Sequence, residues 1–153
     1  MEFKTYHFDE LTPRQIQAMY KLRVAIFVVE QNCPYQEVDD TDLTALHLFG
    51  TDAEGQLVAY ARLMQEHGNQ ARFGRVIVSE AARGHGSGQR LVQTAIDQIQ
   101  KLWPDTTQIN IQGQFYLDKF YRSFGLVPVS DVYLEDGIPH QDMVLKLTPS
   151  QTK

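Results

Sequence analysis

The alternation of apolar and polar residues along the chain predicts a series of strands and helices. Alternating or continuous apolar runs predict strands over residues 3–8, 45–51, 56–65, 73–79, 108–112, 127–134 and 140–147. Apolar residues at helical spacing predict helices over residues 13–29 and over a long segment that Pro104 ends, with a short helix over residues 115–124. The first helix has a clear start, because Thr12 can cap it and Pro13 suits its first turn.

The order of these elements predicts an α+β fold in which helices cover a mixed sheet. The run Val76–Val78 is apolar at every position, which indicates a central strand covered on both faces. Arg23 interrupts the apolar stripe of the first helix. A buried arginine needs an acidic partner or an anionic ligand, so Arg23 is a candidate functional residue.

The composition is that of a soluble globular protein, since 42% of the 153 residues are hydrophobic and 22% are charged. Cys33 is the only cysteine, so no disulfide can form within the chain. Residues 1–10 lack the apolar core of a secretory signal, and no apolar run approaches the roughly 18 residues of a membrane span. We therefore expect a cytoplasmic protein without a membrane partner. The five histidines have no ligand spacing, so no metal site is expected.

The net charge of −5 is unevenly distributed along the chain. Residues 30–55 contain seven acids and no lysine or arginine, whereas residues 68–103 contain five bases and two acids. A locally basic segment suits an anionic ligand and an acidic segment suits a cationic one, although an uneven solvated surface produces the same pattern. The acidic total argues against nucleic acid as a partner.

A glycine-rich segment joins the strand predicted at residues 73–79 to the helix that follows. It reads Arg83-Gly84-His85-Gly86-Ser87-Gly88. Glycines at a helix start let a ligand approach the backbone, whose free N–H groups attract an anion together with the helix dipole. The segment therefore predicts a phosphate or pyrophosphate site, and a tight turn with flexible glycines is the alternative. The P-loop and dinucleotide-binding patterns both fit it badly.

At this segment the sequence resembles the GNAT (Gcn5-related N-acetyltransferase) superfamily. The hallmark of that superfamily, Arg/Gln-x-x-Gly-x-Gly/Ala, is matched by Arg83, Gly86 and Gly88. A second signature is matched over residues 114–126, with glutamine where asparagine is usual and leucine in the last place. Two signatures in the expected order make the resemblance specific.

Within that superfamily the chain resembles the ElaA group, small bacterial proteins assigned as acetyltransferases, over residues 22–35, 74–80 and 135–140. The resemblance implies a single N-acetyltransferase domain over residues 3–148. It also implies a three-layer α/β/α fold with a mixed, mostly antiparallel central sheet. The implied cosubstrate is acetyl-CoA, and no metal is implied.

The resemblance further implies which residues hold acetyl-CoA. The pyrophosphate would lie on the N–H groups of residues 83–88. The pantetheine arm would pair like an extra strand with Val76–Val78, where an N–H can polarise the thioester carbonyl. Gln114 and Tyr121 would complete the site, and Tyr121 would donate a proton to the departing thiolate. Packing of the Tyr121 ring on the sheet is the alternative role.

The base and the acceptor site are less well defined. An attacking ammonium must lose a proton, and Glu30, Glu37 and His140 are the candidate bases. The candidate acceptor-site residues are Arg23, Phe27, Asp39 and Arg62. Together with Asp42, their order is similar to that in acyl-homoserine-lactone synthases, GNAT-fold enzymes that bind S-adenosylmethionine and an acyl carrier protein. The alternative is a buried network in which the two arginines pair with the two aspartates.

The expected function is transfer of an acetyl group from acetyl-CoA to a primary amine of a small molecule or peptide by direct attack. The acids of residues 30–55 are expected to attract that cationic acceptor. The alternatives are an acyl-homoserine-lactone-synthase-like acyltransferase and a non-catalytic acyl-CoA sensor. The chain is expected to be a monomer or a homodimer.

Overall fold

A computed structural model describes residues 1–148 and contains an eight-stranded sheet in the order β1-β2-β3-β4-β5-β8-β6, with β7 also pairing with β8. The strands are β1 (Glu2–His7), β2 (Leu46–Thr51), β3 (Leu57–Glu66), β4 (Gln70–Val78), β5 (Gln108–Gln114), β6 (Val127–Pro128), β7 (Tyr133–Glu135) and β8 (Ile138–Lys146). The α-helices are α1 (Pro13–Val24), α2 (Ser87–Leu102) and α3 (Asp118–Arg122). The β4–β5 pair is parallel and the other pairs are antiparallel, which confirms the mixed, mostly antiparallel sheet.

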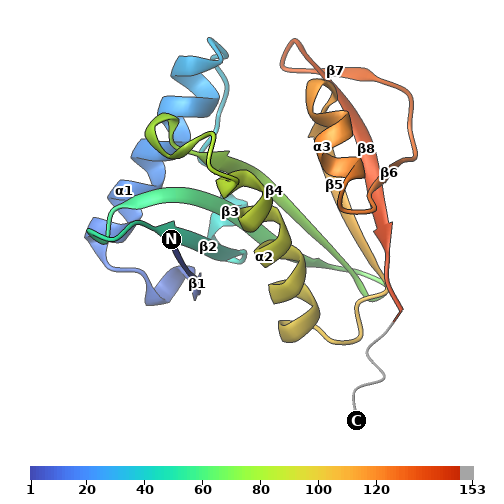
Figure 1. Ribbon diagram of the computed structural model, residues 1–153, viewed down its shortest axis with the longest axis horizontal. Coiled ribbons are helices and arrows are strands. Elements are labelled where there is room, and N and C mark those ends of the chain that lie inside the picture. The colour runs from blue at the N-terminus through green and yellow to red at the C-terminus, as the bar shows by residue number, and fades with distance from the viewer. Residues whose placement is uncertain (149–153) are drawn as a thin grey trace.

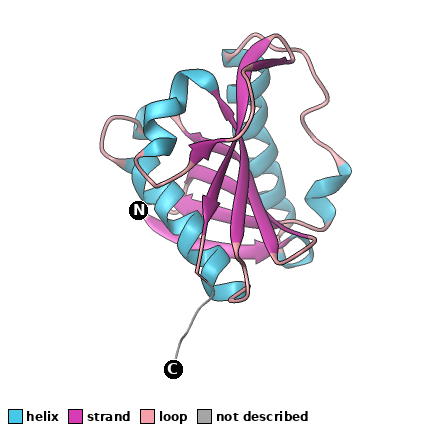
Figure 2. Cartoon of the chain, turned by 90° about the vertical axis from the view of Figure 1, so that its right-hand side faces the viewer, coloured by secondary structure: helices cyan, strands magenta, loops and turns pink. Residues whose placement is uncertain are grey.

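Helices cover both faces of this sheet (Figures 1 and 2). Helix α1 packs on one face through a buried cluster of Leu11, Met19, Ile26, Phe49, Tyr60 and Ile77. Helices α2 and α3 share the larger cluster on the other face, which includes Leu63, Phe73, Leu91, Ile99, Ile109 and Tyr121. Alternate residues of β3 serve the two clusters, because successive side chains of a strand point to opposite faces. The predicted α+β fold with three layers is confirmed.

Strands β4 and β5 pair over a short length only. Gln70–Arg72 lies beside Gln108–Asn110, and beyond these residues the two strands separate toward their C-terminal ends (Figure 1). The last residues of β4 keep their pairing with β3 on the other side, where Ile77 lies opposite Tyr60. One edge of β4 therefore carries backbone N–H and C=O groups that no strand pairs.

Three elements differ from the predicted ones. The first helix changes at Ala25 into a π-helix that runs to Glu30, which helical spacing of apolar residues does not reveal. The strand predicted over residues 127–134 is divided into β6 and β7, since Pro128 cannot donate to a ladder and residues 129–132 leave the sheet. The helix predicted over residues 115–124 starts with a 3₁₀ turn, so α3 is only five residues long.

Candidate active site

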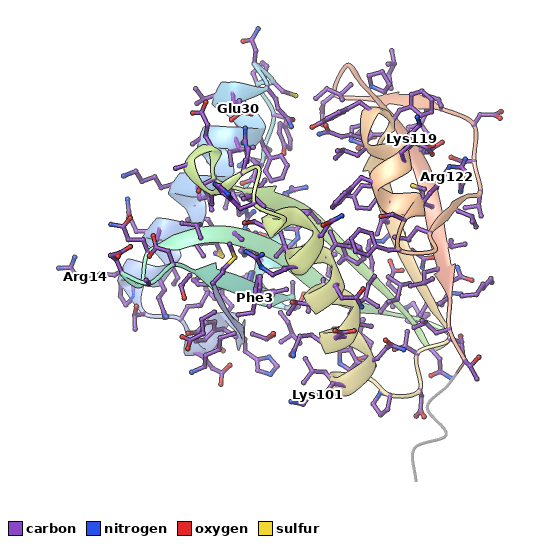
Figure 3. All side chains as sticks on the ribbon, in the orientation of Figure 1. Phe3, Arg14, Glu30, Lys101, Lys119 and Arg122 are labelled. Carbon is purple, nitrogen blue, oxygen red and sulfur yellow. The ribbon has the colours of Figure 1, made fainter. Side chains whose placement is uncertain are left out.

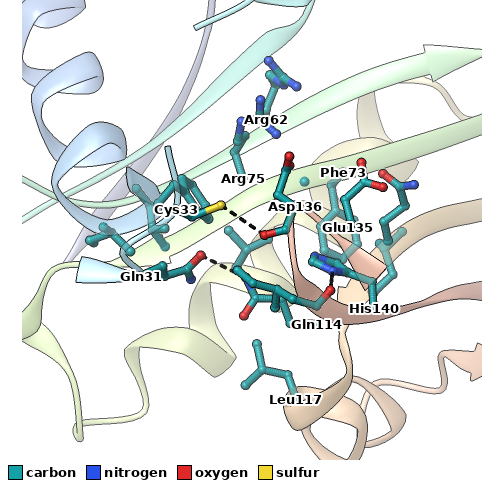
Figure 4. A pocket seen from close by; sticks show the side chains of 18 of the residues that line it. Gln31, Cys33, Arg62, Phe73, Arg75, Gln114, Leu117, Glu135, Asp136 and His140 are labelled. Carbon is teal, nitrogen blue, oxygen red and sulfur yellow. Dashed lines mark hydrogen bonds between the residues drawn. The ribbon is translucent and has the colours of Figure 1, made fainter. Parts of the chain in front are cut away.

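A cavity of about 700 Å³ occupies the gap between β4 and β5 (Figure 4). Val76–Val78 forms one wall, and Ile111, Gln112 and Gln114 belong to the other. Across the cavity, the Nε2 of Gln114 lies 3.4 Å from the Oε1 of Gln31. The cavity thus lies where the open edge of β4 offers unpaired backbone groups to a ligand.

The glycine-rich segment has the backbone that an anion site requires. Gly84 and Gly86 have φ values of +84° and +73°, in the left-handed region that favours glycine. Gly86 is the N-cap of α2, and no side chain caps this helix. The first N–H groups of a helix have no intrahelical partner, so the positive end of α2 is available to an anion.

Arg83 connects this segment with the end of the π-helix. Its Nε donates to the carbonyl oxygen of Val78 at 2.9 Å, and its two terminal nitrogens each lie 3.1 Å from a carboxylate oxygen of Glu30. Figure 3 shows Glu30 above the loop that precedes α2. Both side chains are substantially exposed, so a phosphate bound here would compete with Glu30 for the guanidinium group.

Tyr121 belongs to α3, and its ring packs near Gly113 of β5. Only 5% of its surface is exposed, and it also lines the cavity. Its ring contacts the edge of Phe120, with the centroids 5.3 Å apart. Burial, with a smaller contribution from Tyr116, raises the pKa of Tyr121 above its ordinary value. Like an ordinary tyrosine, Tyr121 is protonated at neutral pH and so has a proton to donate.

His140 is oriented by two contacts. Its Nδ1 lies 2.7 Å from the carbonyl oxygen of Ile138, which can only accept, so Nδ1 carries the hydrogen and Nε2 of the neutral ring has a free lone pair. The ring stacks on Tyr133 with the centroids 6.3 Å apart. Tyr133 is itself fixed, since its hydroxyl donates to Asp142 at 2.6 Å and accepts from Gln112 at 3.2 Å. Among the three candidate bases, His140 alone has a basic atom beside the cavity that no group within residues 1–148 occupies.

The other two candidate bases are engaged in ion pairs. Glu37 is 2% exposed, and its Oε2 lies 2.9 Å from Arg23 and 2.7 Å from Arg75. Glu30 forms the pair with Arg83. A carboxylate whose lone pairs accept from guanidinium groups is poorly placed to take a proton from a substrate.

Glu37 belongs to a larger network of charged residues at one end of the cavity. Three arginines, Arg23, Arg62 and Arg75, pair with three acids, Glu37, Asp39 and Asp42. Arg23 is fully buried, and its Nη1 lies 2.8 Å from the Oδ1 of Asp42. The formal charges of the network sum to zero. The acids of residues 30–55 therefore supply much less negative potential than their number suggests.

The comparisons with known proteins agree with this geometry. A profile of the acetyltransferase (GNAT) domain matches residues 10–147. The chain belongs to the GNAT acetyltransferase family. It is therefore an acyltransferase, as the two signatures predict.

Several relatives are similar to this chain over almost their whole length. Protein ElaA of Escherichia coli (strain K12) is 44% identical over 147 residues, which cover 94% of this chain and 95% of ElaA. The crystal structure of Escherichia coli ElaA superposes with a TM-score of 0.89 at 43% identity, covering 95% of this chain and 100% of that one. An acyl-CoA N-acyltransferase from Pseudomonas aeruginosa gives a TM-score of 0.87 at 40% identity, covering 95% and 99%.

A more distant neighbour shares only the fold with this GNAT chain. The NatC complex bound to Gag peptide and CoA matches with a TM-score of 0.69 at 19% identity, covering 97% of this chain and 100% of that one.

The structure brings most of the candidate site residues of the GNAT chain to one cavity. Those that line it are Phe27, Glu30, Asp39, Arg62, Val76, Ile77, Val78, Arg83, Gln114, Tyr121 and His140. Arg23 and Glu37 are buried behind the wall, and Gly84, His85, Gly86, Ser87 and Gly88 lie outside the lining.

The sequence interpretation missed Arg75. It lies at a β-bulge of β4 with a φ of +50°, where Tyr60 and Arg62 of β3 face Ile77 and Gly74. Its guanidinium group lies over the ring of Phe27 at 6.0 Å and over that of Tyr35 at 5.7 Å. The pair Gly74-Arg75, which lies between Phe73 and the apolar run Val76–Val78, is the signal that could have indicated the bulge.

Within residues 1–148 no group of His, Cys, Asp or Glu residues could hold a metal ion. No helix in the same range is long and apolar enough to cross a membrane.

Proposed function

We propose that this GNAT acyltransferase moves an acetyl group from acetyl-CoA to a primary amine of a small molecule or peptide, acting as one domain over residues 3–148. The observation that carries the proposal is the cavity between the separated strands β4 and β5, which Tyr121 and His140 both line. One side chain keeps a proton and the other offers a free lone pair. This is the pair of groups that acyl transfer to an ammonium requires.

The residues of the chain fit acetyl-CoA as a substrate. The uncapped start of α2 would hold the pyrophosphate through the N–H groups of residues 83–88. The unpaired edge of Val76–Val78 would hydrogen-bond the pantetheine arm, as a neighbouring strand would. The distant fold neighbour that is bound to CoA supports this assignment.

The chemistry follows from the two side chains. Nε2 of His140 accepts a proton from the acceptor ammonium, and the amine nitrogen then attacks the thioester carbonyl carbon. A backbone N–H of Val76–Val78 stabilises the negative charge that develops on the carbonyl oxygen. Tyr121 donates its hydroxyl proton to the sulfur as the C–S bond breaks. The second proton of the attacking nitrogen restores the Tyr121 hydroxyl, and His140 releases the proton that it accepted to water. The products are an amide and the free thiol of CoA.

Two acidic residues at the turn between β7 and β8 support an amine as the acceptor. Glu135 and Asp136 line the cavity at the turn between β7 and β8, and neither has an ion-pair partner within residues 1–148. Their negative charge favours a cationic acceptor on this side. The charged residues whose order is similar to that in acyl-homoserine-lactone synthases pair with one another in the ion-pair network. They therefore do not favour that second function. A cytoplasmic location and a monomeric or homodimeric state stay predictions.

The test is a thiol-release assay with acetyl-CoA and a panel of polyamines, amino acids, aminosugars and peptide N-termini. We expect turnover with at least one amine, and a kcat reduced about 10- to 1,000-fold in Tyr121→Phe. The acetyl-CoA-induced rise in Tm should persist in that variant. Binding of acetyl-CoA without turnover of any amine would indicate a sensor. A lactone product formed with S-adenosylmethionine would indicate the synthase activity.

A further inference from the structure

Gly113 is a buried residue near the end of β5. Its φ is outside the left-handed region in which six other glycines of the described chain lie. Glycine weakens a strand, because it loses more conformational freedom on folding and offers no side chain for packing. The backbone of β5 does not require a glycine here, so the reason must lie in what surrounds this residue.

The space of the missing side chain is taken by Tyr121. A Cβ atom at Gly113 would lie 3.2 Å from Cδ2 and 3.4 Å from Cε2 of the Tyr121 ring, and 3.5 Å from Cδ1 of Ile111. By contrast, a Cβ at Gly74, which also lies in a strand, would have no neighbour within 4 Å. The shorter of the two ring contacts is tighter than most carbon–carbon contacts in proteins, so an added methyl would push the ring away from β5.

The Tyr121 ring is held in place by packing. It belongs to the buried cluster on the face of the sheet that α2 and α3 cover. The ring lies between Gly113 on one side and the edge of Phe120, while a Cβ at Gly88 would be 3.6 Å from Phe120. A larger side chain at position 113 would therefore shift the ring and, with it, the Tyr121 hydroxyl.

We propose that Gly113 is a positioning residue that sets the distance between the Tyr121 hydroxyl and the departing sulfur. The proposal rests on the role of Tyr121 as proton donor in the proposed function. A proton donor acts efficiently only within hydrogen-bond reach of the atom that it protonates. A methyl group at Gly113 displaces the ring by a few tenths of an ångström, and a branched side chain displaces it further.

The test compares Gly113→Ala and Gly113→Val in the thiol-release assay. We expect kcat to fall about 3- to 10-fold in the first variant and about 100-fold in the second, because small misplacements of a reacting group have effects of this order. The acetyl-CoA-induced shift in Tm should stay unchanged in both. Ile109→Val is the matched control, since Ile109 is buried on the same face of β5 and does not line the cavity. It should lower Tm and leave kcat unchanged.

A double-mutant cycle separates positioning from a general structural effect. In the Tyr121→Phe background no hydroxyl remains to be misplaced, so Gly113→Ala should lower kcat little further. An equal loss in both backgrounds would reject the positioning role. A wild-type kcat in Gly113→Ala beside an impaired Tyr121→Phe would reject it too. A wild-type kcat in Tyr121→Phe would instead reject the proposed acid role.

Discussion

The charged network can be tested most directly at Asp42, which is 1% exposed and is shared by two arginines. Its Oδ1 lies 2.8 Å from Arg23 and 3.0 Å from Arg62. Asp42→Asn keeps the shape of the side chain and removes its charge, so both guanidinium groups lose a counter-charge. Breaking a buried ion pair from one side costs about 3–5 kcal/mol, because a charge is left without compensation.

For a chain of 153 residues a loss of 3–5 kcal/mol lowers Tm by about 6–20 °C. The assay is a thermal melt of three Asp→Asn variants whose side chains differ in burial and in ion pairing. Asp42→Asn should have the largest effect, and Asp39→Asn, whose side chain is 35% exposed, should lower Tm by a few degrees. Asp40→Asn is the control, because Asp40 is exposed on the same short segment and has no ion pair within residues 1–148. Equal Tm values for Asp42→Asn and Asp40→Asn would refute the reasoning.

The same network predicts a dependence of stability on pH. Burial opposes ionisation of Asp42, but hydrogen bonds from Arg23 and Arg62 outweigh it and hold the pKa of that carboxyl below its ordinary value. A group with a lowered pKa in the folded state stabilises the protein above its unfolded pKa, about 3.9 for aspartate. This stability is lost as the pH falls through the folded pKa. Wild-type Tm should therefore fall more steeply below pH 4 than that of Asp42→Asn.

Two further predictions concern the ends of the cavity. Gly86→Val should abolish the acetyl-CoA-induced rise in Tm, because a side chain at the left-handed N-cap of α2 blocks the anion site. Gly55→Val is the control: it has a similar φ in a distant turn and should preserve the rise in Tm. His140→Gln should lower kcat about 100-fold, measured by steady-state kinetics. Acetyl-CoA affinity, measured by thermal shift, should change little. An undiminished kcat would show that His140 is not the base.

The regular parts of the fold could be predicted from the sequence because their signals are local. The apolar stripe of α2 and the apolar run Val76–Val78 give the correct elements, since one buried face imposes a period on the sequence. Gly86 was predicted as part of an anion site because glycine at a helix start lets a ligand approach the backbone, and this role stays a prediction. The second family signature predicted that Gln114 and Tyr121 belong to one site, and both line the cavity.

The acceptor side could not be predicted in the same way, because its geometry depends on contacts between distant segments. Glu37 was a plausible base in the sequence, and only the fold shows that Arg23 and Arg75 occupy its oxygens. In the sequence His140 could equally be a surface turn residue. Only the fold shows that its ring lines the cavity and that its Nδ1 bonds to the carbonyl oxygen of Ile138. The alternative of a buried network, stated for Arg23, needed the folded chain to name its partners.

Two departures from regular backbone geometry, the π-helix and the bulge of β4, meet at the charged network. The π-helix carries Phe27, and the bulge of β4 turns Arg75 over its ring at 6.0 Å. A non-glycine residue at positive φ costs about 1–3 kcal/mol and persists only where its surroundings hold it. At Arg75 the holding contact is Glu37, at 2.7 Å. Because the network is neutral, we infer that it holds this end of the cavity in shape. In the proposed function the negative charge that favours a cationic acceptor then comes from Glu135 and Asp136, which line the cavity at the turn between β7 and β8.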